Sequence, residues 1–110
     1  MRSSRSATDP LAPGPSGFAH RGRHGGAIPE NSLAGFAAAI ALGAGIECDV
    51  RLSGDGTVMV FHDSDLRRLS GVALEVEQTP AALLCGQRLS GTDQYPPTLA
   101  QLLALVDGRV

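Results

Sequence analysis

The sequence has few of the features that would assign a chain to a class at once. It has two cysteines, Cys48 and Cys85, no lysine among its nine basic residues, and a net charge of −2. Two distant cysteines without a secretory signal favour reduced thiols and a cytoplasmic location, with a structural disulfide as the alternative. Because the basic residues are scattered, the sequence indicates neither a nucleic-acid partner nor a membrane surface.

Long apolar runs are also missing. Residues 1–15 are rich in Ser, Arg, Pro and Ala, without a stretch long enough for a signal-peptide core or a membrane span. We therefore expect a disordered lead-in over 1–15, a folded portion over 16–110, and no stable membrane insertion. There is no Gly-rich phosphate loop with a lysine and no nucleophile-elbow serine, so nucleoside triphosphate chemistry and acyl transfer are disfavoured.

Two segments carry the spacing of amphipathic helices. Apolar residues recur over 33–41, after Asn31 or Ser32 as the N-cap and before a glycine as the stop. The run Thr98-Leu99-Ala100-Gln101 fits a capping box and predicts a second helix that ends near Gly108.

Strand patterns lie on either side of the first helix. The apolar segment 16–20 predicts a buried strand that ends in His20. Residues 45–52 alternate in polarity, which predicts one strand with an apolar face (Ile46, Cys48, Val50, Leu52) and a polar face (Glu47, Asp49, Arg51). Strands and helices in this order indicate an α/β fold.

A tight turn joins the second strand to a third. Asp55-Gly56 is a hairpin signal, and the residues over 57–61 are apolar or β-branched. With a two-residue loop Asp49 would lie directly opposite His62, and a four-residue loop would place Glu47 there. Any loop of even length therefore keeps His62 on the carboxylate face, whereas a bulge would shift the register.

Glu47 and Asp49 are the candidate metal ligands. Two positions apart on a strand, their carboxylates project to the same side and can share one ion. Ligation by oxygen alone suits Ca²⁺ or Mg²⁺ and argues against zinc. From the spacing alone, a solvated strand face with ordinary acids is the simpler interpretation.

His20 and His62 are the candidate acid and base. An imidazole titrates near neutral pH, so one ring can accept a proton from an attacking hydroxyl while the other donates to the leaving oxygen. Arg21 offers a planar fork that matches two phosphoryl oxygens. Taken singly, each histidine would rather be structural, whereas for Arg21 a surface arginine and a phosphoryl contact are equally good interpretations. Asp63 either orients His62 or caps the segment that follows.

Short motifs occur in one order along the chain: His20-Arg21-Gly22, Pro29-Glu30-Asn31-Ser32, Glu47-Cys48-Asp49-Val50, Asp55-Gly56 and His62-Asp63. This series resembles the amino-terminal part of the glycerophosphodiester phosphodiesterase family, from about Phe18 to the last residue. Each motif is so short that it often occurs by chance, but the whole series in this order is hard to obtain by chance.

The resemblance implies a fold and a reaction. The fold would be the amino-terminal portion of a TIM (β/α)₈ barrel of the phospholipase C-like phosphodiesterase type, truncated before the third barrel strand. The reaction would be metal-dependent hydrolysis of glycerophosphodiesters to glycerol 3-phosphate and an alcohol, with a divalent cation, Ca²⁺ or Mg²⁺, as cofactor. Such an enzyme belongs to lipid and glycerol metabolism.

The resemblance also implies an acid–base pair, a phosphoryl contact and a metal site. These fall on His20 and His62, on Arg21, and on Glu47 and Asp49. Glu30 and Asn31 are expected near the substrate, in a supporting or ligand role. The family pattern has a further Glu, followed by a Lys, on the third barrel strand, which Arg109-Val110 would begin. Gln101 stands where the family often has Glu.

Two other functions stay open. The chain could be a non-catalytic fragment or phosphate-binding module that keeps anion recognition through Arg21 and the loop over 22–31. It could also be a relative that acts on phosphoinositides or sphingolipids, which share a two-histidine strategy.

Overall fold

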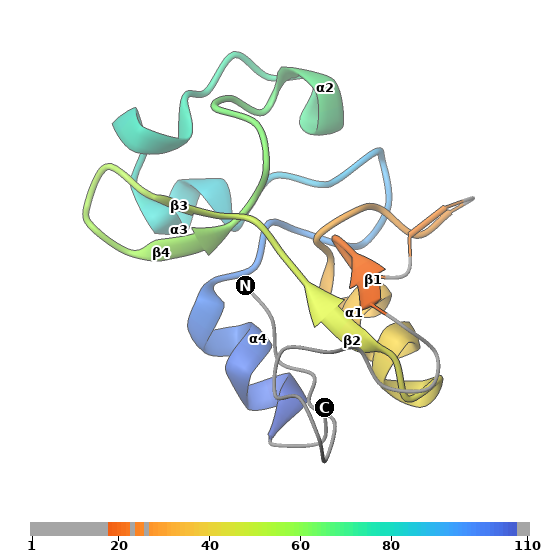
Figure 1. Ribbon diagram of the computed structural model, residues 1–110. Coiled ribbons are helices and arrows are strands. Elements are labelled where there is room, and N and C mark those ends of the chain that lie inside the picture. The colour runs from red at the N-terminus through yellow and green to blue at the C-terminus, as the bar shows by residue number, and fades with distance from the viewer. Residues whose placement is uncertain (1–17, 23, 26, 108–110) are drawn as a thin grey trace.

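Two short parallel strands and the helix between them form the first unit of the fold (Figure 1). Strand β1 (Phe18–His20) pairs with β2 (Gly45–Glu47), and helix α1 (Leu33–Ala41) connects them. The computed structural model describes residues 18–22, 24, 25 and 27–107. The lead-in expected over 1–15 lies outside the described residues.

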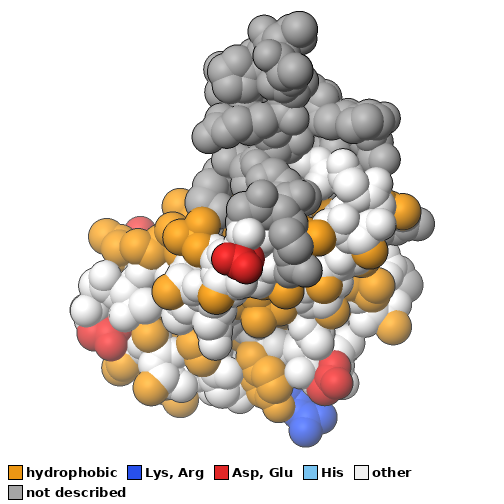
Figure 2. Space-filling model, turned by 90° about the horizontal axis from the view of Figure 1, so that it is seen from below, with side chains coloured by type: hydrophobic (Ala, Val, Ile, Leu, Met, Phe, Trp, Pro, Cys, Tyr) orange, Lys and Arg blue, Asp and Glu red, His pale blue; other side chains and the backbone are white. Residues whose placement is uncertain are grey.

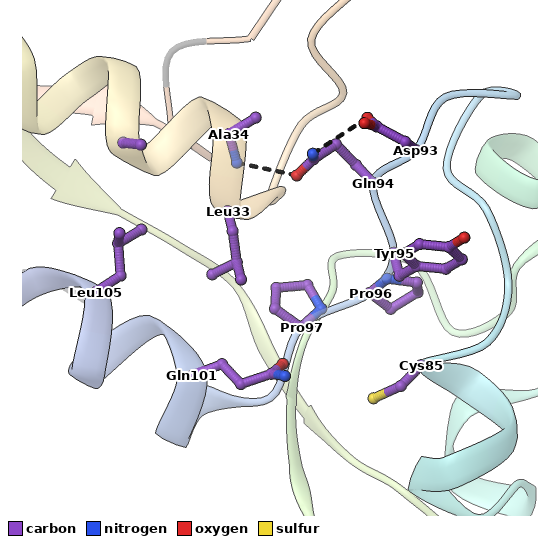
Figure 3. A pocket seen from close by; sticks show the side chains of 11 residues that line it. Leu33, Ala34, Cys85, Asp93, Gln94, Tyr95, Pro96, Pro97, Gln101 and Leu105 are labelled. Atoms are coloured by element: carbon purple, nitrogen blue, oxygen red, sulfur yellow. Dashed lines mark hydrogen bonds between the residues drawn. The ribbon is translucent and has the colours of Figure 1, made fainter.

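Helix α1 forms where it was predicted, because local side chains specify both of its ends. Ser32 is the N-cap, and its Oγ accepts a hydrogen bond from Gly35 N at 3.1 Å. Gly43 follows the helix with a φ of +69°, the left-handed conformation that commonly ends helices. Gln94, which is distant in the sequence, supplies a further acceptor at the amino-terminal end of the helix: its Oε1 accepts a hydrogen bond from Ala34 N at 3.0 Å (Figure 3).

The strand predicted over 45–52 is divided in two, so this prediction was wrong. The chain changes its pairing partner after β2: β3 (Val50–Leu52) is antiparallel to β4 (Val58–Val60) and belongs to a separate sheet. At the change, Asp49 N donates to the side-chain Oδ1 of Asn31 at 3.4 Å. Alternation in polarity continues across the break, which is why the sequence did not reveal it.

Because the predicted strand is divided in two, its four apolar residues do not form one continuous buried face. Ile46 and Cys48 are buried as expected, but Val50 and Leu52 are 46% and 55% exposed. Both residues belong to β3, which pairs with β4 and no longer with β1.

The hairpin is confirmed, but its predicted register is wrong. Ser53 N donates to Thr57 O at 2.8 Å, so the loop has three residues, an odd number. Gly56 N donates to Ser53 O at 3.1 Å, and Gly56 has a φ of +84°. A turn followed by one left-handed residue is the usual construction of three-residue hairpin loops. As a result Phe61, and not His62, bonds the backbone of Asp49, with Phe61 N 2.9 Å from Asp49 O.

Strand β4 is shared by two hydrophobic clusters. Because successive strand residues face opposite sides, Val60 points into one cluster while Met59 and Phe61 point into the other. The α1–α4 cluster packs α1 and β2 against helix α4 (Leu99–Val106). The hairpin cluster includes side chains from α2 (Arg67–Ser70), the 3₁₀ helix η1 (Val76–Gln78) and α3 (Ala81–Leu84).

Helix α4 begins with the predicted capping box. Thr98 Oγ1 accepts from Gln101 N at 3.1 Å, and Gln101 Oε1 accepts from Thr98 N at 2.9 Å. Gln101 therefore caps the helix as a glutamate would. The helix ends before Asp107, which has a left-handed φ of 44°. The strand expected to begin at Arg109-Val110 lies outside the described residues.

The face shown in Figure 2 is largely apolar, with few charged side chains among the described residues. The exposed large apolar residues include Leu42, Val50, Leu52 and Leu103. Among the described helices, none combines the length and apolar character that crossing a membrane requires.

A substitution at Gly54 tests how closely the hairpin loop packs on the backbone at the end of η1. A Cβ at position 54 would lie 2.9 Å from Thr79 N and 3.0 Å from the carbonyl carbon of Gln78. Because these are backbone atoms, η1 would have to shift. We expect Gly54→Ala to lower the free energy of unfolding in urea by about 1–3 kcal/mol.

Gly86→Ala is the matched control, because its new Cβ would have no neighbour closer than 3.5 Å. We expect it to change the free energy of unfolding by less than about 1 kcal/mol. Equal losses in the two variants would contradict the close packing at Gly54.

Candidate active site

The carboxyl ends of β1 and β2 bring His20 and Glu47 together. The two residues are register partners, and His20 Nε2 lies 3.1 Å from Glu47 Oε1. Both side chains are open to solvent, at 62% and 35% exposure. In α/β folds the carboxyl ends of parallel strands are where ligands bind, so this edge is the candidate site.

Arg21, the next residue, lies between two carboxylates. Its Nη1 is 3.1 Å from Glu30 Oε2, and its Nε is 3.2 Å from Asp49 Oδ2. Arg21 has a left-handed φ of 57°, and Asn31, whose N donates to Arg21 O at 2.7 Å, has a φ of 52°. Such conformations cost energy in residues with a side chain, and they cluster at functional sites.

Gly22 completes the turn after β1, and only glycine fits there. Its φ is +77°, and an added Cβ would lie 3.0 Å from both Gly35 C and Phe36 Cδ1. The backbone of the His-Arg-Gly motif therefore packs directly on the first turn of α1, which fixes the direction in which Arg21 leaves the strand.

Asn31 holds Asp49 in place. Its Nδ2 donates to Asp49 Oδ2 at 3.2 Å, and its Oδ1 accepts from Asp49 N at 3.4 Å. Asn31 is 1% exposed, so its amide is a buried support of the carboxylate.

Arg68 joins Glu30 to Asp63, and the sequence reasoning did not assign it a role in the site. Arg68 Nη1 and Nη2 donate to Glu30 Oε1 and Oε2 at 2.8 and 2.9 Å. Its Nε and Nη2 donate to Asp63 Oδ2 and Oδ1 at 2.9 and 3.1 Å. Arg67 precedes it in the sequence with the same charge, so composition gave no signal that distinguished the two.

These contacts change the pKa values of both acids. The hydrogen bonds from Arg68 lower the pKa of Asp63 to about 2, with His62 as a further cause. The pKa of Glu30 is also lowered, first by its hydrogen bonds with Arg68 and then by the charges of Arg68 and Arg21, against the opposing effect of burial. Glu30 and Asp63 in turn raise the pKa of Arg68. All three groups are therefore held in their charged forms.

His62 lies two residues beyond β4, with its Nδ1 2.8 Å from Asp63 Oδ1. Its backbone O accepts from Arg51 Nε at 2.8 Å. Of the two roles open for Asp63, contact with His62 is the one found, because Asp65 Oδ1 accepts from Arg67 N at the start of α2. The prediction that His62 lies opposite Asp49 was wrong, since the odd loop moves Phe61 to that position.

The cysteines do not offer an activated nucleophile. Cys48 and Cys85 are not joined in a disulfide, and burial raises the pKa of both thiols. A raised pKa keeps a thiol protonated and unreactive. His24 is exposed, as expected.

Glu47 and Asp49 fit a hard divalent cation in ligand type. Both offer carboxylate oxygens from one short stretch, β2 and the residues after it. Among the described residues, no group of three or more His, Cys, Asp and Glu side chains is arranged to hold a metal ion. Since Ca²⁺ and Mg²⁺ take six or more oxygen ligands, this pair would supply only part of a coordination shell.

Comparison with known proteins shows a family to which the chain is similar over most of its length. Residues 20–109 match the model of the glycerophosphoryl diester phosphodiesterase family. The chain belongs to this family. It is 34% identical over 98 residues to the glycerophosphodiester phosphodiesterase of Caldanaerobacter subterraneus, a match that covers 81% of this chain and 39% of that protein.

Solved structures of similar proteins agree on the fold. A phosphodiesterase of Oleispira antarctica, in complex with the product sn-glycerol-3-phosphate, has a TM-score of 0.75 and 33% identity, covering 84% of this chain and 40% of that chain. The glycerophosphodiester phosphodiesterase of Agrobacterium tumefaciens has a TM-score of 0.78 and 31% identity, covering 86% and 43%. The expected fold class, a portion of a glycerophosphodiester phosphodiesterase TIM barrel, is confirmed.

The carboxylates beside Arg68 predict a loss of stability in acid. The unfolded chain has ordinary pKa values, 3.8 for Asp63 and 4.5 for Glu30, and both are lower in the folded chain. Their contribution to stability is therefore complete above these values and is lost as the pH falls from about 4.5 toward 2. We expect urea midpoints to fall across this window.

Asp63→Asn should lower stability at pH 7 and flatten the decline below pH 4, because one of the two shifted carboxylates is gone. Asp93→Asn, at an exposed aspartate, is the matched control and should keep the decline. An Asp63→Asn chain that loses stability in acid as steeply as the parent would contradict the role of the Arg68 contacts.

Proposed function

We propose that this chain provides part of the active site of a metal-dependent hydrolase that converts glycerophosphodiesters to glycerol 3-phosphate and an alcohol. One observation carries the proposal. A continuous series of contacts runs from His62 through Asp63, Arg68, Glu30 and Arg21 to Asp49. Residues singled out from four separate motifs are thereby part of one polar network, and His20, next to Arg21, touches Glu47.

His20 and His62 are the proposed acid–base pair. Because Nδ1 of His62 faces Asp63, its Nε2 is the nitrogen that would accept or donate the proton. His20 Nε2 faces Glu47 at the carboxyl edge of the parallel strands. The two imidazoles come from different segments, so one would serve the attacking oxygen and the other the leaving oxygen.

Arg21 is the proposed phosphoryl contact, supported by Glu30 and Asn31. Its guanidinium is oriented by Glu30 and Asp49, so its donors are fixed before a substrate arrives. Glu47 and Asp49 would hold a divalent cation, Ca²⁺ or Mg²⁺. When bound, the cation would add positive charge beside the phosphoryl oxygens.

The proposed partner is a small glycerophosphodiester. The product named in the Oleispira antarctica structure supports this substrate class. A net charge of −2 with scattered arginines supports no nucleic-acid partner. A cytoplasmic location is consistent with two cysteines that are not joined in a disulfide.

The chain spans about 40% of the similar structures. Because Glu47 and Asp49 supply only part of a metal shell, we expect no turnover of glycerophosphocholine by the 110-residue chain. Binding of the product is therefore the test of the site.

Glycerol 3-phosphate should bind this chain more tightly in the presence of Ca²⁺ or Mg²⁺ than in EDTA, as measured by isothermal titration calorimetry. Arg21→Lys keeps the charge but loses the fork, so we expect binding to weaken by about tenfold or more. Exposed Arg88→Lys is the matched control and should bind like the parent.

Equal affinity with and without the cation would favour a simple anion pocket and overturn the metal role of Glu47 and Asp49. Absence of binding in the presence of the cation, with the fold intact by circular dichroism, would overturn the proposed site as a whole.

A further inference from the structure

Arg68 holds two carboxylates at once, each with two hydrogen bonds. Nε and Nη2 donate to Asp63, and Nη1 and Nη2 donate to Glu30, at distances of 2.8 to 3.1 Å. A planar guanidinium that bonds both oxygens of a carboxylate fixes the plane of that carboxylate as well as its position. A lysine at this position could not do so.

The orientation of Asp63 decides the orientation of His62. Asp63 Oδ1 receives a hydrogen bond from Arg68 Nη2 and lies 2.8 Å from His62 Nδ1. An acceptor at Nδ1 favours the tautomer in which Nδ1 carries the proton and Nε2 is bare. Without Arg68, the carboxylate of Asp63 would be able to rotate away from the ring.

Arg68 is itself anchored by the short helix that carries it. It lies in α2, where its neighbour Leu69 is buried in the hairpin cluster and Asp65 Oδ1 accepts a hydrogen bond from Arg67 N at 3.0 Å. Packing in the hairpin cluster thus determines where the guanidinium of Arg68 is placed.

We propose that Arg68 is a positioning residue: through Asp63 it keeps Nδ1 of His62 turned toward the protein and Nε2 available for proton transfer. Through Glu30 the same guanidinium sets the position of His62 relative to Arg21. The inference rests on the proposed function for the meaning of His62, but the arrangement itself is testable without substrate.

The contacts of Arg68 with the two carboxylates orient these groups more than they stabilise the fold. The side chain of Arg68 is 49% exposed, and exposed ion pairs stabilise folds only slightly. Glu30, which is buried, keeps Arg21 as a partner when Arg68 is replaced. We therefore expect Arg68 variants to fold.

The test measures the tautomer of each of the three histidines in the 110-residue chain by ¹H–¹⁵N correlation spectra. At about pH 8.5 the parent His62 should show the Nδ1–H form in roughly tenfold excess over the Nε2–H form. In Arg68→Met the excess should fall to about threefold or less. Arg67→Met removes the same charge one residue earlier, from a side chain that is 73% exposed, and should leave His62 unchanged.

Arg68→Lys separates geometry from charge and should lose most of the excess as well. An unchanged His62 tautomer in Arg68→Met and Arg68→Lys, with the backbone amides of α1 and β2 unshifted, would show that Asp63 suffices and would overturn the proposal. If Arg68→Met does not fold, Arg68→Lys decides alone. Because no ligand is added, a failure here is distinct from a failure to bind glycerol 3-phosphate.

Discussion

The in-register parallel pairing of β1 with β2 is the constraint on which the site depends. It sets His20 opposite Glu47, and a slip of one residue would place an apolar neighbour there and turn the acid to the other face. Arg21, directly after β1, and Asp49, two residues after β2, then meet at the same edge. Gly22 and the first turn of α1 close this arrangement by contact between backbones.

Beyond the strands, the site is a network in which every arginine faces acids. Arg21 lies between Glu30 and Asp49, and Arg68 lies between Glu30 and Asp63. Such mutual support orients each charged group before a ligand is present, so little reorganisation is needed when an anionic phosphodiester arrives. Glu30 belongs to both pairs and connects the half of the network near β1 to the half near His62.

Local signals in the sequence were sufficient to predict those helices and turns whose ends they specify. Ser32, Gly43 and the Thr98–Gln101 box defined α1 and α4, and Asp55-Gly56 located the hairpin. The break after Glu47 and the odd loop were missed, because alternation does not say which strand is the partner and Asp-Gly fits more than one loop length. The site motifs were found from their order along the chain, whereas Arg68 is recognised only once α2 is folded against the network. Whether each site residue has its expected role in catalysis stays a prediction.

Strand β4 and the residue after it separate the α1–α4 cluster from the hairpin cluster: Val60 belongs to the first cluster, and Met59 and Phe61 belong to the second. Loss of packing in either cluster would expose the face of the strand that this cluster covers and would remove one side of the support of the strand on which the other cluster packs. The two halves of the molecule should therefore melt as a single cooperative unit. A substitution far from the catalytic edge, for example at Leu84 of α3, should then also alter the position of His62 through β4, which ends two residues before it.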